Sequence, residues 1–246
     1  MKFNTYFLFL ALSTAFISGP AAATISLNGT RVVFDGRNRE ATVTVSNQGE
    51  DILIQSWLEP QHEDDPELPF VVTPPLARLP AKQQQLIRVL YEGSGMPTDK
   101  ESAFWLNVQE IPQTAPGENL LQLAVRQRIK VFYRPPELSD DVTQAPENLQ
   151  WRLLRENGKT LLRAENPGRF HITLVALQFG AGKSGKPISD ANMIAPGASQ
   201  QWELPANGAL PDAELNYSII NDFGGYVAYR VQLSGEEAAK PKAKSG

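Results

Sequence analysis

Short stretches in which apolar and polar residues alternate follow one another along most of the chain. From Ser26 onward they are separated by turn residues such as Asp35-Gly36 and Asn157-Gly158. Alternation with a period of two puts successive side chains on opposite faces of a β-strand. No long run repeats apolar residues at helical spacing. The pattern therefore predicts an all-β fold.

The alternating stretches fall into two sets of seven, the strand number of an immunoglobulin-type sandwich. The first set is Ser26–Phe34, Ala41–Val45, Ile52–Leu58, Phe70–Thr73, Gln85–Tyr91, Ala103–Ile111 and Leu120–Arg134. The second set is Trp151–Arg155, Thr160–Glu165, His171–Phe179, Ile188–Ile194, Gln200–Leu204, Glu214–Asn221 and Val227–Leu233. Between them, Pro135–Pro146 carries three prolines and three acidic residues with little apolar content, which indicates a linker.

Residues 1–23 have the layout of a secretory signal peptide. Lys2 precedes an apolar run from Phe7 to Ile17 and a small-residue site that ends at Ala23, so we expect cleavage before Thr24. The apolar run is shorter than the roughly 20 residues that a membrane-spanning helix needs, which argues against a membrane anchor. Removing the leader leaves 223 of the 246 residues, enough for two domains of about 110 residues or for one large all-β domain.

Composition narrows the possible functions. The net charge is −4, and −5 once Lys2 leaves with the leader, so the chain as a whole is not suited to nucleic acid. The sequence has no Cys, so buried apolar area and not disulfides must stabilise it.

We expect domains at residues 24–140 and 141–235. The tail, residues 236–246, has no core-forming residue beyond Ala and is expected to be disordered.

No arrangement of residues indicates catalysis. Gly182-Lys183-Ser184 resembles the end of a phosphate-binding loop, but Leu177 stands where that motif needs its first glycine. His62 precedes three acidic residues in a proline-flanked loop without ordered metal-ligand spacing. His171 is the only other histidine, and the chain lacks both Cys and a Gly-x-Ser-x-Gly motif. We therefore expect no enzyme activity, no metal and no cofactor.

Four motifs, in this order along the chain, resemble those of the PapD-like periplasmic pilus chaperones. They are Thr30–Phe34, Pro97–Pro112 (PTDKESAFWLNVQEIP), Lys130–Pro135 and Asn221–Gly225, of which the second is the most specific. The resemblance covers the chain from residue 24 to the start of the tail. Gln113 departs from the family pattern, which usually has a small residue or proline there. The loop at 113–119 is short, which resembles the short-loop branch that builds rod-like pili.

The resemblance implies a fold and a function. The fold is two immunoglobulin-like sandwiches in an L-shaped arrangement with a cleft between them. The function is that of a periplasmic chaperone that binds, folds and caps pilus (fimbrial) subunits in 1:1 complexes by donor-strand complementation, and delivers them to an outer-membrane usher. Neither nucleic acid nor membrane insertion is implied. The alternative is an immunoglobulin-like surface adhesin or a structural fibre component, and such a subunit would be expected to lack one strand.

The stretch Leu120–Arg134 is long for a strand, since it has 15 residues against a usual 5 or 6. Within it, Leu121, Leu123 and Val125 share one face. From the residues alone, these side chains could simply fill the core of their own domain. The resemblance implies instead that they enter a groove on an incomplete subunit, where each buried side chain contributes about 1.5 to 3 kcal/mol.

Two cations stand among hydrophobic neighbours, Arg31 in the first predicted strand and Lys130 near the end of the long one. Taken alone they read as solvated surface charges. The resemblance implies that they grip the C-terminal carboxylate of the subunit, through charge-assisted hydrogen bonds. Lys130 lies five residues after Val125, so a regular strand would point the two side chains to opposite faces. Either twist or a bulge intervenes, or the cleft is reached from the other face of the sheet.

Three further charges lie inside the family motifs, namely Glu110, Arg134 and Asp222. Without the resemblance they are three unrelated surface charges. With it, they match a charged triad that links the two domains, whose partly buried ion pairs would fix the angle between them.

Overall fold

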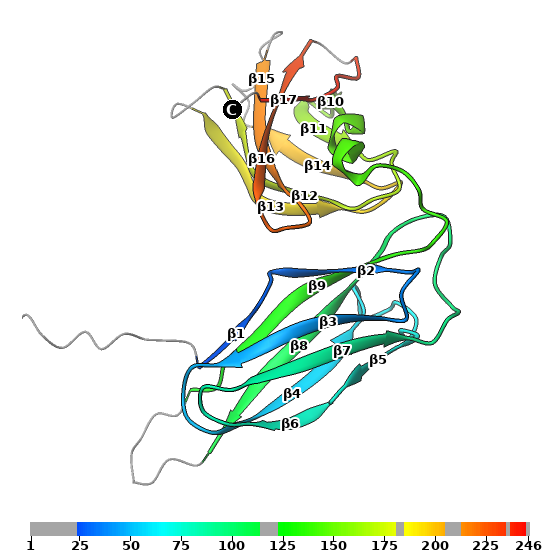
Figure 1. The fold of residues 1–246 in the computed structure, drawn as a ribbon. Helices are drawn as coiled ribbons and strands as arrows, with labels where there is room; N and C mark the ends of the chain where they lie inside the picture. The colour runs from blue at the N-terminus through cyan, green and yellow to red at the C-terminus, as the bar shows by residue number, and fades with distance from the viewer. Residues whose placement is uncertain (1–23, 114–122, 181–184, 205–212, 235–236, 245–246) are drawn as a thin grey trace, which may run out of the picture.

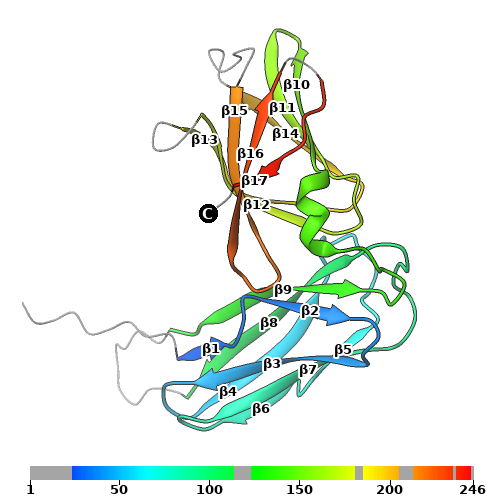
Figure 2. The same ribbon diagram turned by 45° about the horizontal axis from the view of Figure 1, so that its top comes forward.

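The computed structural model describes residues 24–113, 123–180, 185–204, 213–234 and 237–244. These residues form seventeen strands and one 3-10 helix. They are arranged as two β-sandwiches set at an angle to each other (Figures 1 and 2). The predicted all-β fold with two immunoglobulin-like domains is confirmed.

The N-terminal domain consists of two sheets. A four-stranded sheet has the order β1-β3-β7-β5 and a five-stranded sheet has the order β2-β9-β8-β4-β6. The strands are β1 (Ile25–Leu27), β2 (Arg31–Asp35), β3 (Glu40–Asn47), β4 (Ile52–Glu59), β5 (Phe70–Thr73), β6 (Leu76–Leu79), β7 (Gln84–Tyr91), β8 (Ser102–Pro112) and β9 (Arg126–Arg134). The pairing of β2 with β9 is parallel, and the other strand pairs of this domain are antiparallel.

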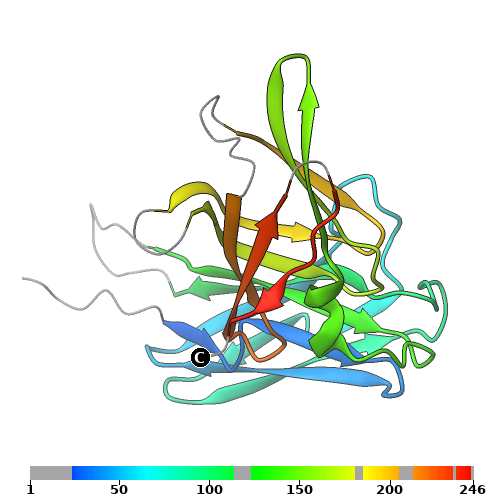
Figure 3. The ribbon, with the colours of Figure 1, turned by 90° about the horizontal axis from the view of Figure 1, so that it is seen from above.

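The C-terminal domain also consists of two sheets, seen from above in Figure 3. A three-stranded sheet has the order β10-β11-β14 and a five-stranded sheet has the order β13-β12-β15-β16-β17. The strands are β10 (Gln150–Glu156), β11 (Lys159–Glu165), β12 (Ile172–Phe179), β13 (Lys186–Ile194), β14 (Ser199–Leu204), β15 (Ala213–Ile220), β16 (Tyr226–Leu233) and β17 (Lys242–Ala243).

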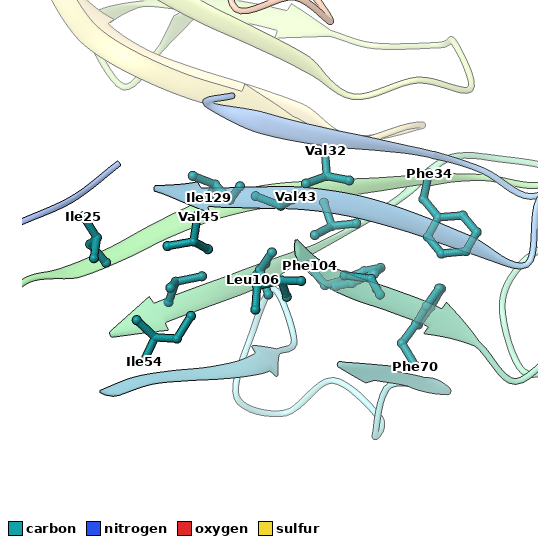
Figure 4. Packing of buried hydrophobic residues seen from close by; sticks show 14 of the residues in the cluster. Ile25, Val32, Phe34, Val43, Val45, Ile54, Phe70, Phe104, Leu106 and Ile129 are labelled. Carbon is teal, nitrogen blue, oxygen red and sulfur yellow. The ribbon is translucent and has the colours of Figure 1, made fainter. Parts of the chain in front are cut away.

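Each domain has its own apolar core, supplied by alternate residues of the facing sheets. In the N-terminal domain Val32 and Phe34 of β2 meet Phe70 of β5 and Phe104 of β8 (Figure 4). In the C-terminal domain the fully buried Trp151 packs 5.2 Å, ring to ring, from Tyr217. Each Å² of apolar surface that is buried stabilises the fold by about 25 cal/mol. In a chain without disulfides, this burial is therefore the main stabilising contribution.

The same polar device closes a turn in both domains. Asn47 and Asn166 are fully buried, and each donates its side-chain N–H groups to three backbone carbonyls. Each also accepts a hydrogen bond from the glycine two residues later, at 2.8 Å from Gly49 and 3.0 Å from Gly168. A buried amide that is satisfied in this way fixes a turn at little desolvation cost.

Three strand predictions need correction. The stretch Ser26–Phe34 is two strands, because the chain leaves the four-stranded sheet after Leu27 and enters the other sheet at Arg31. The described residues contain more than seven strands per domain, since β6 and β17 were not predicted. The long strand Leu120–Arg134 is also wrong at its start, because β9 begins at Arg126.

The tail is ordered where the structure describes it, contrary to the prediction of disorder. Lys242–Ala243 pairs with β16. Ala239 exchanges two backbone hydrogen bonds of 2.9 Å with Trp151 and packs against the core. Backbone groups can extend a sheet without large apolar side chains, so composition alone gave the wrong answer.

The linker at Pro135–Pro146 contains part of a helix that the sequence pattern did not predict. Helix η1 spans Val142–Asn148, and Asp141 caps it by accepting a hydrogen bond of 2.9 Å from the Thr143 backbone N–H. Ala145 and Pro146 are buried, so this part of the linker packs against the protein.

Candidate functional site

β2 and β9 lie on the side of the N-terminal domain that faces the C-terminal domain (Figure 1). In their parallel pairing Arg31 stands directly opposite Lys130. Ile129, Val131 and the other odd-numbered residues of β9 face the core, whereas Lys130 and Phe132 face outward. The β8–β9 register runs without a shift from Ser102 onward. The cleft is therefore on the other face of the sheet, and no bulge is needed.

Arg31 is half-buried and reaches the C-terminal domain. Its Nη1 donates a hydrogen bond of 3.1 Å to the Ile220 carbonyl, and its guanidinium lies 5.6 Å from the ring centroid of Phe132. Its buried Nε has no hydrogen-bond partner. Burial lowers the pKa of Arg31, and the charges of Asp222 and Glu101 oppose that shift.

Lys130 is also half-buried and contacts the C-terminal domain through a weak acceptor. Its Nζ lies 3.2 Å from the sulfur of Met193 and 5.2 Å from the ring centroid of Trp105. Burial, and then the charge of Arg31, lower the pKa of Lys130. Among the described residues neither Lys130 nor Arg31 forms an ion pair with a carboxylate. Two adjacent desolvated cations of this kind suit an anion brought by another molecule.

A cavity of about 560 Å³ opens beside Arg31. Val32, Ile129, Asp222 and Phe223 contribute to its lining. The Phe223 side chain is 97% exposed at the tip of the β15–β16 turn. Arg31 thus lines an open cavity that has an exposed aromatic ring among its lining residues.

One edge of β9 is only partly covered. β8 pairs with β9 from Arg126 to Tyr133, but β2 pairs with it only from Lys130 onward. Within the described ranges, no strand pairs with the second edge of Arg126–Ile129. Just before β9, Leu123 is 71% exposed and Val125 is half-buried. Leu121 lies outside the described residues.

Glu110 is not part of the interdomain cluster, so its prediction is wrong. It lies at the other end of β8, with 2% exposure, and its Oε1 accepts a hydrogen bond of 2.9 Å from the Val125 backbone N–H. The antiparallel register of β8 and β9, continued by one residue at each end, puts Glu110 level with Val125 and Glu101 level with Arg134. The Glu110 side chain thus takes the place of the Glu110 backbone carbonyl as acceptor for the Val125 N–H. β9 therefore starts at Arg126, one residue after Val125.

We expect Glu110→Ala to expose the Val125 amide. The lost hydrogen bond involves a charged group, and such bonds contribute about 1.5 to 3 kcal/mol, so hydrogen exchange at Val125 should accelerate roughly tenfold to a hundredfold. Amide exchange measured by NMR tests this. Glu110→Gln is the matched control, because its side-chain oxygen still accepts the bond. Equal exchange in Glu110→Ala and the unmodified protein would contradict the assignment.

Arg134 joins the two domains through two carboxylates. Its Nε donates to Glu101 at 2.7 Å, and its Nη1 and Nη2 donate to the two oxygens of Asp222 at 2.7 Å each. The second oxygen of Glu101 accepts from the His171 backbone N–H at 2.8 Å and lies 2.9 Å from Nδ1 of that ring. Although burial opposes the charge, the hydrogen bonds and charges of Asp222 and Glu101 raise the pKa of Arg134.

The turn at Asn221–Gly225 explains how this motif holds Asp222 beside Arg134. Asn221 Oδ1 accepts from the backbone N–H groups of Phe223 and Gly225, which closes the turn. Gly224 has φ +80°, and a Cβ there would lie 2.6 Å from the Thr30 hydroxyl of the other domain. Only glycine fits both the backbone angle and the close approach.

Sequence reasoning missed Glu101, His171, Trp105 and Met193. Glu101 and Trp105 lie inside the motif Pro97–Pro112. Antiparallel pairing of this strand with the next would have put them opposite the basic residues Arg134 and Lys130. His171 and Met193 are contributed by the other domain, and no local pattern marks them. The sequence Gly182-Lys183-Ser184 lies outside the described residues. Among those described, no cluster of His, Cys, Asp or Glu could hold a metal ion, and no helix is long and apolar enough to cross a membrane.

The fold and the site define a two-domain immunoglobulin-like protein with a cationic cleft between its domains. Two family models match the chain, the PapD N-terminal domain of pili and flagellar-assembly chaperones over residues 24–139 and the C-terminal domain of the pili assembly chaperone PapD over residues 144–231. The probable fimbrial chaperone LpfB of Escherichia coli O157:H7 is 39% identical over 223 residues, which cover 89% of this chain and 92% of LpfB.

Solved structures agree. The crystal structure of the YadV chaperone superposes with a TM-score of 0.73 at 34% identity, covering 86% of this chain and all of that one. SafB, solved in complex with the SafA pilin of Salmonella enterica, gives a TM-score of 0.70 at 29% identity, covering 92% and 99%. The chain belongs to the PapD-like family of periplasmic pilus-assembly chaperones, which is a family of chaperones and not of enzymes.

Proposed function

We propose that this protein holds a pilus subunit in the periplasm, with Arg31 and Lys130 gripping the subunit's C-terminal carboxylate in the cleft. The observation that carries the proposal is the pair of adjacent, half-buried cations without an ion-pair partner in the described part of the chain. The carboxylate would accept hydrogen bonds from donors that, among the described residues, meet one carbonyl and one thioether. Such charge-assisted bonds strengthen in a cleft shielded from water.

The strand edge next to the anchor performs the second part of the function. The edge at Arg126–Ile129 can pair with a subunit strand, and the preceding Leu121, Leu123 and Val125 fill the groove that the incomplete subunit leaves open. Backbone pairing satisfies groups that would otherwise be costly to bury. The subunit stays soluble until it is handed to the outer-membrane usher.

The order of these contacts sets the direction of the bound strand. The carboxylate at Lys130 is the end of the subunit chain, and the groove contacts precede Lys130 along the chaperone chain. The last strand of the subunit therefore runs in the same direction as β9, with its final residues beside Ile129 and Arg128. Anchoring the end fixes the register of everything before it.

Co-purification tests the proposal. The protein isolated natively from the periplasm is expected in 1:1 complexes with subunits of its own fibre, identified by mass spectrometry. Its first residue is expected to be Thr24, with residues 1–23 removed as a leader. Isolation only as a free protein from fibre-producing cells would contradict a chaperone role.

Leu123→Glu should abolish subunit recovery but leave the chaperone folded. The side chain is 71% exposed in the free protein, so the substitution has little effect there, whereas in the complex an unpaired charge would enter an apolar groove. Circular dichroism and subunit yield, measured together, check this. Leu86→Glu, at a 48% exposed position on β7 of the other sheet, is the control. Normal yield from Leu123→Glu would contradict the role of this segment.

A further inference from the structure

Beyond the anchor, the outward face of the five-stranded sheet carries a row of cations stacked on indoles, which we call the Arg–Trp ladder. The guanidinium of Arg126 lies 4.8 Å from the ring centroid of Trp57, and that of Arg128 lies 4.3 Å from Trp105. Trp105 is also the ring beside Lys130, at 5.2 Å. The ladder therefore continues the anchor without a break along β9.

The ladder is held rigid by its own contacts. Glu59 accepts hydrogen bonds from the Trp57 indole at 2.9 Å and from Arg126 at 2.6 Å, and pairs with Arg128 at 2.9 Å. Arg126 also donates twice to Asn107, which is fully buried although it lies on the outward face of the sheet. The indole hydrogen bond and then the two guanidinium charges lower the pKa of Glu59 against the effect of burial. Side chains fixed in this way lose little entropy when a partner binds.

Charge and composition indicate what the ladder binds. It presents Arg126, Arg128 and Lys130 against the single carboxylate of Glu59, on a protein whose net charge is −4. The side chains of Arg126 and Arg128 are 42% and 43% exposed, so both can still be reached. Arg and Trp are the residue types that most often dominate binding energy at protein interfaces. An acidic partner surface fits this face.

Position identifies the partner. The step that follows rests on the proposed function, in which the last strand of the subunit lies along β9 and ends at Lys130. Residues in a strand alternate between faces, so every second side chain of that strand lies on the same face as Arg128 and Arg126. Because those two stand two residues apart, their spacing of about 6.6 to 6.8 Å equals that of two same-face side chains of the bound strand.

We propose that the Arg–Trp ladder determines subunit specificity by reading acidic side chains on the outward face of the subunit's last strand, in the residues just before its C-terminus. The anchor recognises a carboxylate that every chain possesses, so it cannot choose among subunits. The ladder recognises side chains that differ from one subunit to the next. The two sites together give capture and selection on one strand.

A pair of isomeric synthetic peptides tests the ladder. Both alternate valine and serine, end in a free carboxylate and carry two aspartates. In one isomer the aspartates lie one and three residues before the last, and in the other two and four residues before it, so they point to opposite faces. The protein is expected to favour one isomer by about twofold to thirtyfold, since two exposed ion pairs are made with only one of them. The preference should shrink as salt rises.

Substitutions assign that preference to the ladder. The double variant Arg126→Gln, Arg128→Gln is expected to bind both isomers alike, whereas Arg78→Gln, an exposed arginine on the outer strand β6, should keep the preference. Arg128→Glu should instead favour the same isomer when its aspartates are replaced by lysines. These outcomes use binding ratios within one variant, so a general loss of stability cannot imitate them.

The amide forms of the same peptides separate this inference from the proposed function. If the protein prefers free acids to amides but binds both isomers equally, the anchor holds and the ladder proposal is wrong. If acids and amides bind equally, the anchor is wrong, whatever the isomers do. Failure of every peptide to bind would overturn both.

Discussion

Replacing Arg31 or Lys130 with alanine is expected to weaken subunit binding by roughly 30-fold to several thousand-fold. Truncating one partner of a buried interfacial charge pair costs about 2 to 5 kcal/mol, which corresponds to that range. The two cations already occupy a cleft in which burial lowers the pKa of each. The carboxylate of the subunit offsets this desolvation, and removing either side chain removes part of its hydrogen bonding.

The free protein should respond unequally to the two substitutions. Within the described part of the chain, the Lys130 ammonium contacts a thioether and an indole and is repelled by Arg31. Lys130→Ala is therefore expected to leave the melting temperature unchanged or slightly raised. Arg31 also holds the Ile220 carbonyl of the other domain, and its loss should lower stability modestly. Lys159→Ala, in an exposed ion pair on the C-terminal domain, is the control for charge alone. Full subunit binding by both cleft variants would exclude these residues as the anchor.

Arg134→Ala is expected to have the largest effect on stability. It leaves Glu101, whose side chain is 1% exposed, and Asp222 without their shared cation. Removing one partner of a buried ion pair typically costs about 3 to 5 kcal/mol, because the remaining charge stays buried and unpaired. Thermal melts measure this loss, and small-angle scattering measures the looser angle between the domains.

Arg37→Ala is the matched control for Arg134→Ala. Arg37 pairs with Asp35 at 2.6 Å, but its side chain is 74% exposed, so its removal should change stability very little. If both variants melted like the unmodified protein and kept its scattering envelope, the ion pairs of Arg134 would not hold the two domains together.

The sequence predicted best the short strand Phe70–Thr73, a run of aromatic and β-branched residues whose bounds match β5. It failed where hydrogen bonds to the backbone, and not the packing of apolar side chains, decided the outcome. β17 joins its sheet through main-chain pairing with β16, and Ala239 forms a separate bridge with Trp151 of β10. β9 starts late because the Glu110 carboxylate competes for the Val125 amide. Neither effect leaves a hydrophobic pattern in the sequence.

For the candidate site, local motifs located the residues but not their partners. The adjacency of Arg31 and Lys130 follows from a parallel strand pair, which only the three-dimensional register reveals. Glu110 and Glu101 are two acidic residues of one motif, and strand pairing alone puts Glu101 beside Arg134. Met193 comes from the second domain, so its contact with Lys130 depends on how the domains meet.

The central claim is that the cleft binds the end of another chain through its carboxylate. The most direct measurement compares the affinities of two forms of one peptide, copied from the C-terminus of a co-purified subunit, one with a free carboxylate and one amidated. The account predicts that the unmodified protein strongly prefers the free acid and that Arg31→Ala and Lys130→Ala lose this preference. If the Ala variants kept the same preference for the free acid as the unmodified protein, the anchor would have to lie elsewhere.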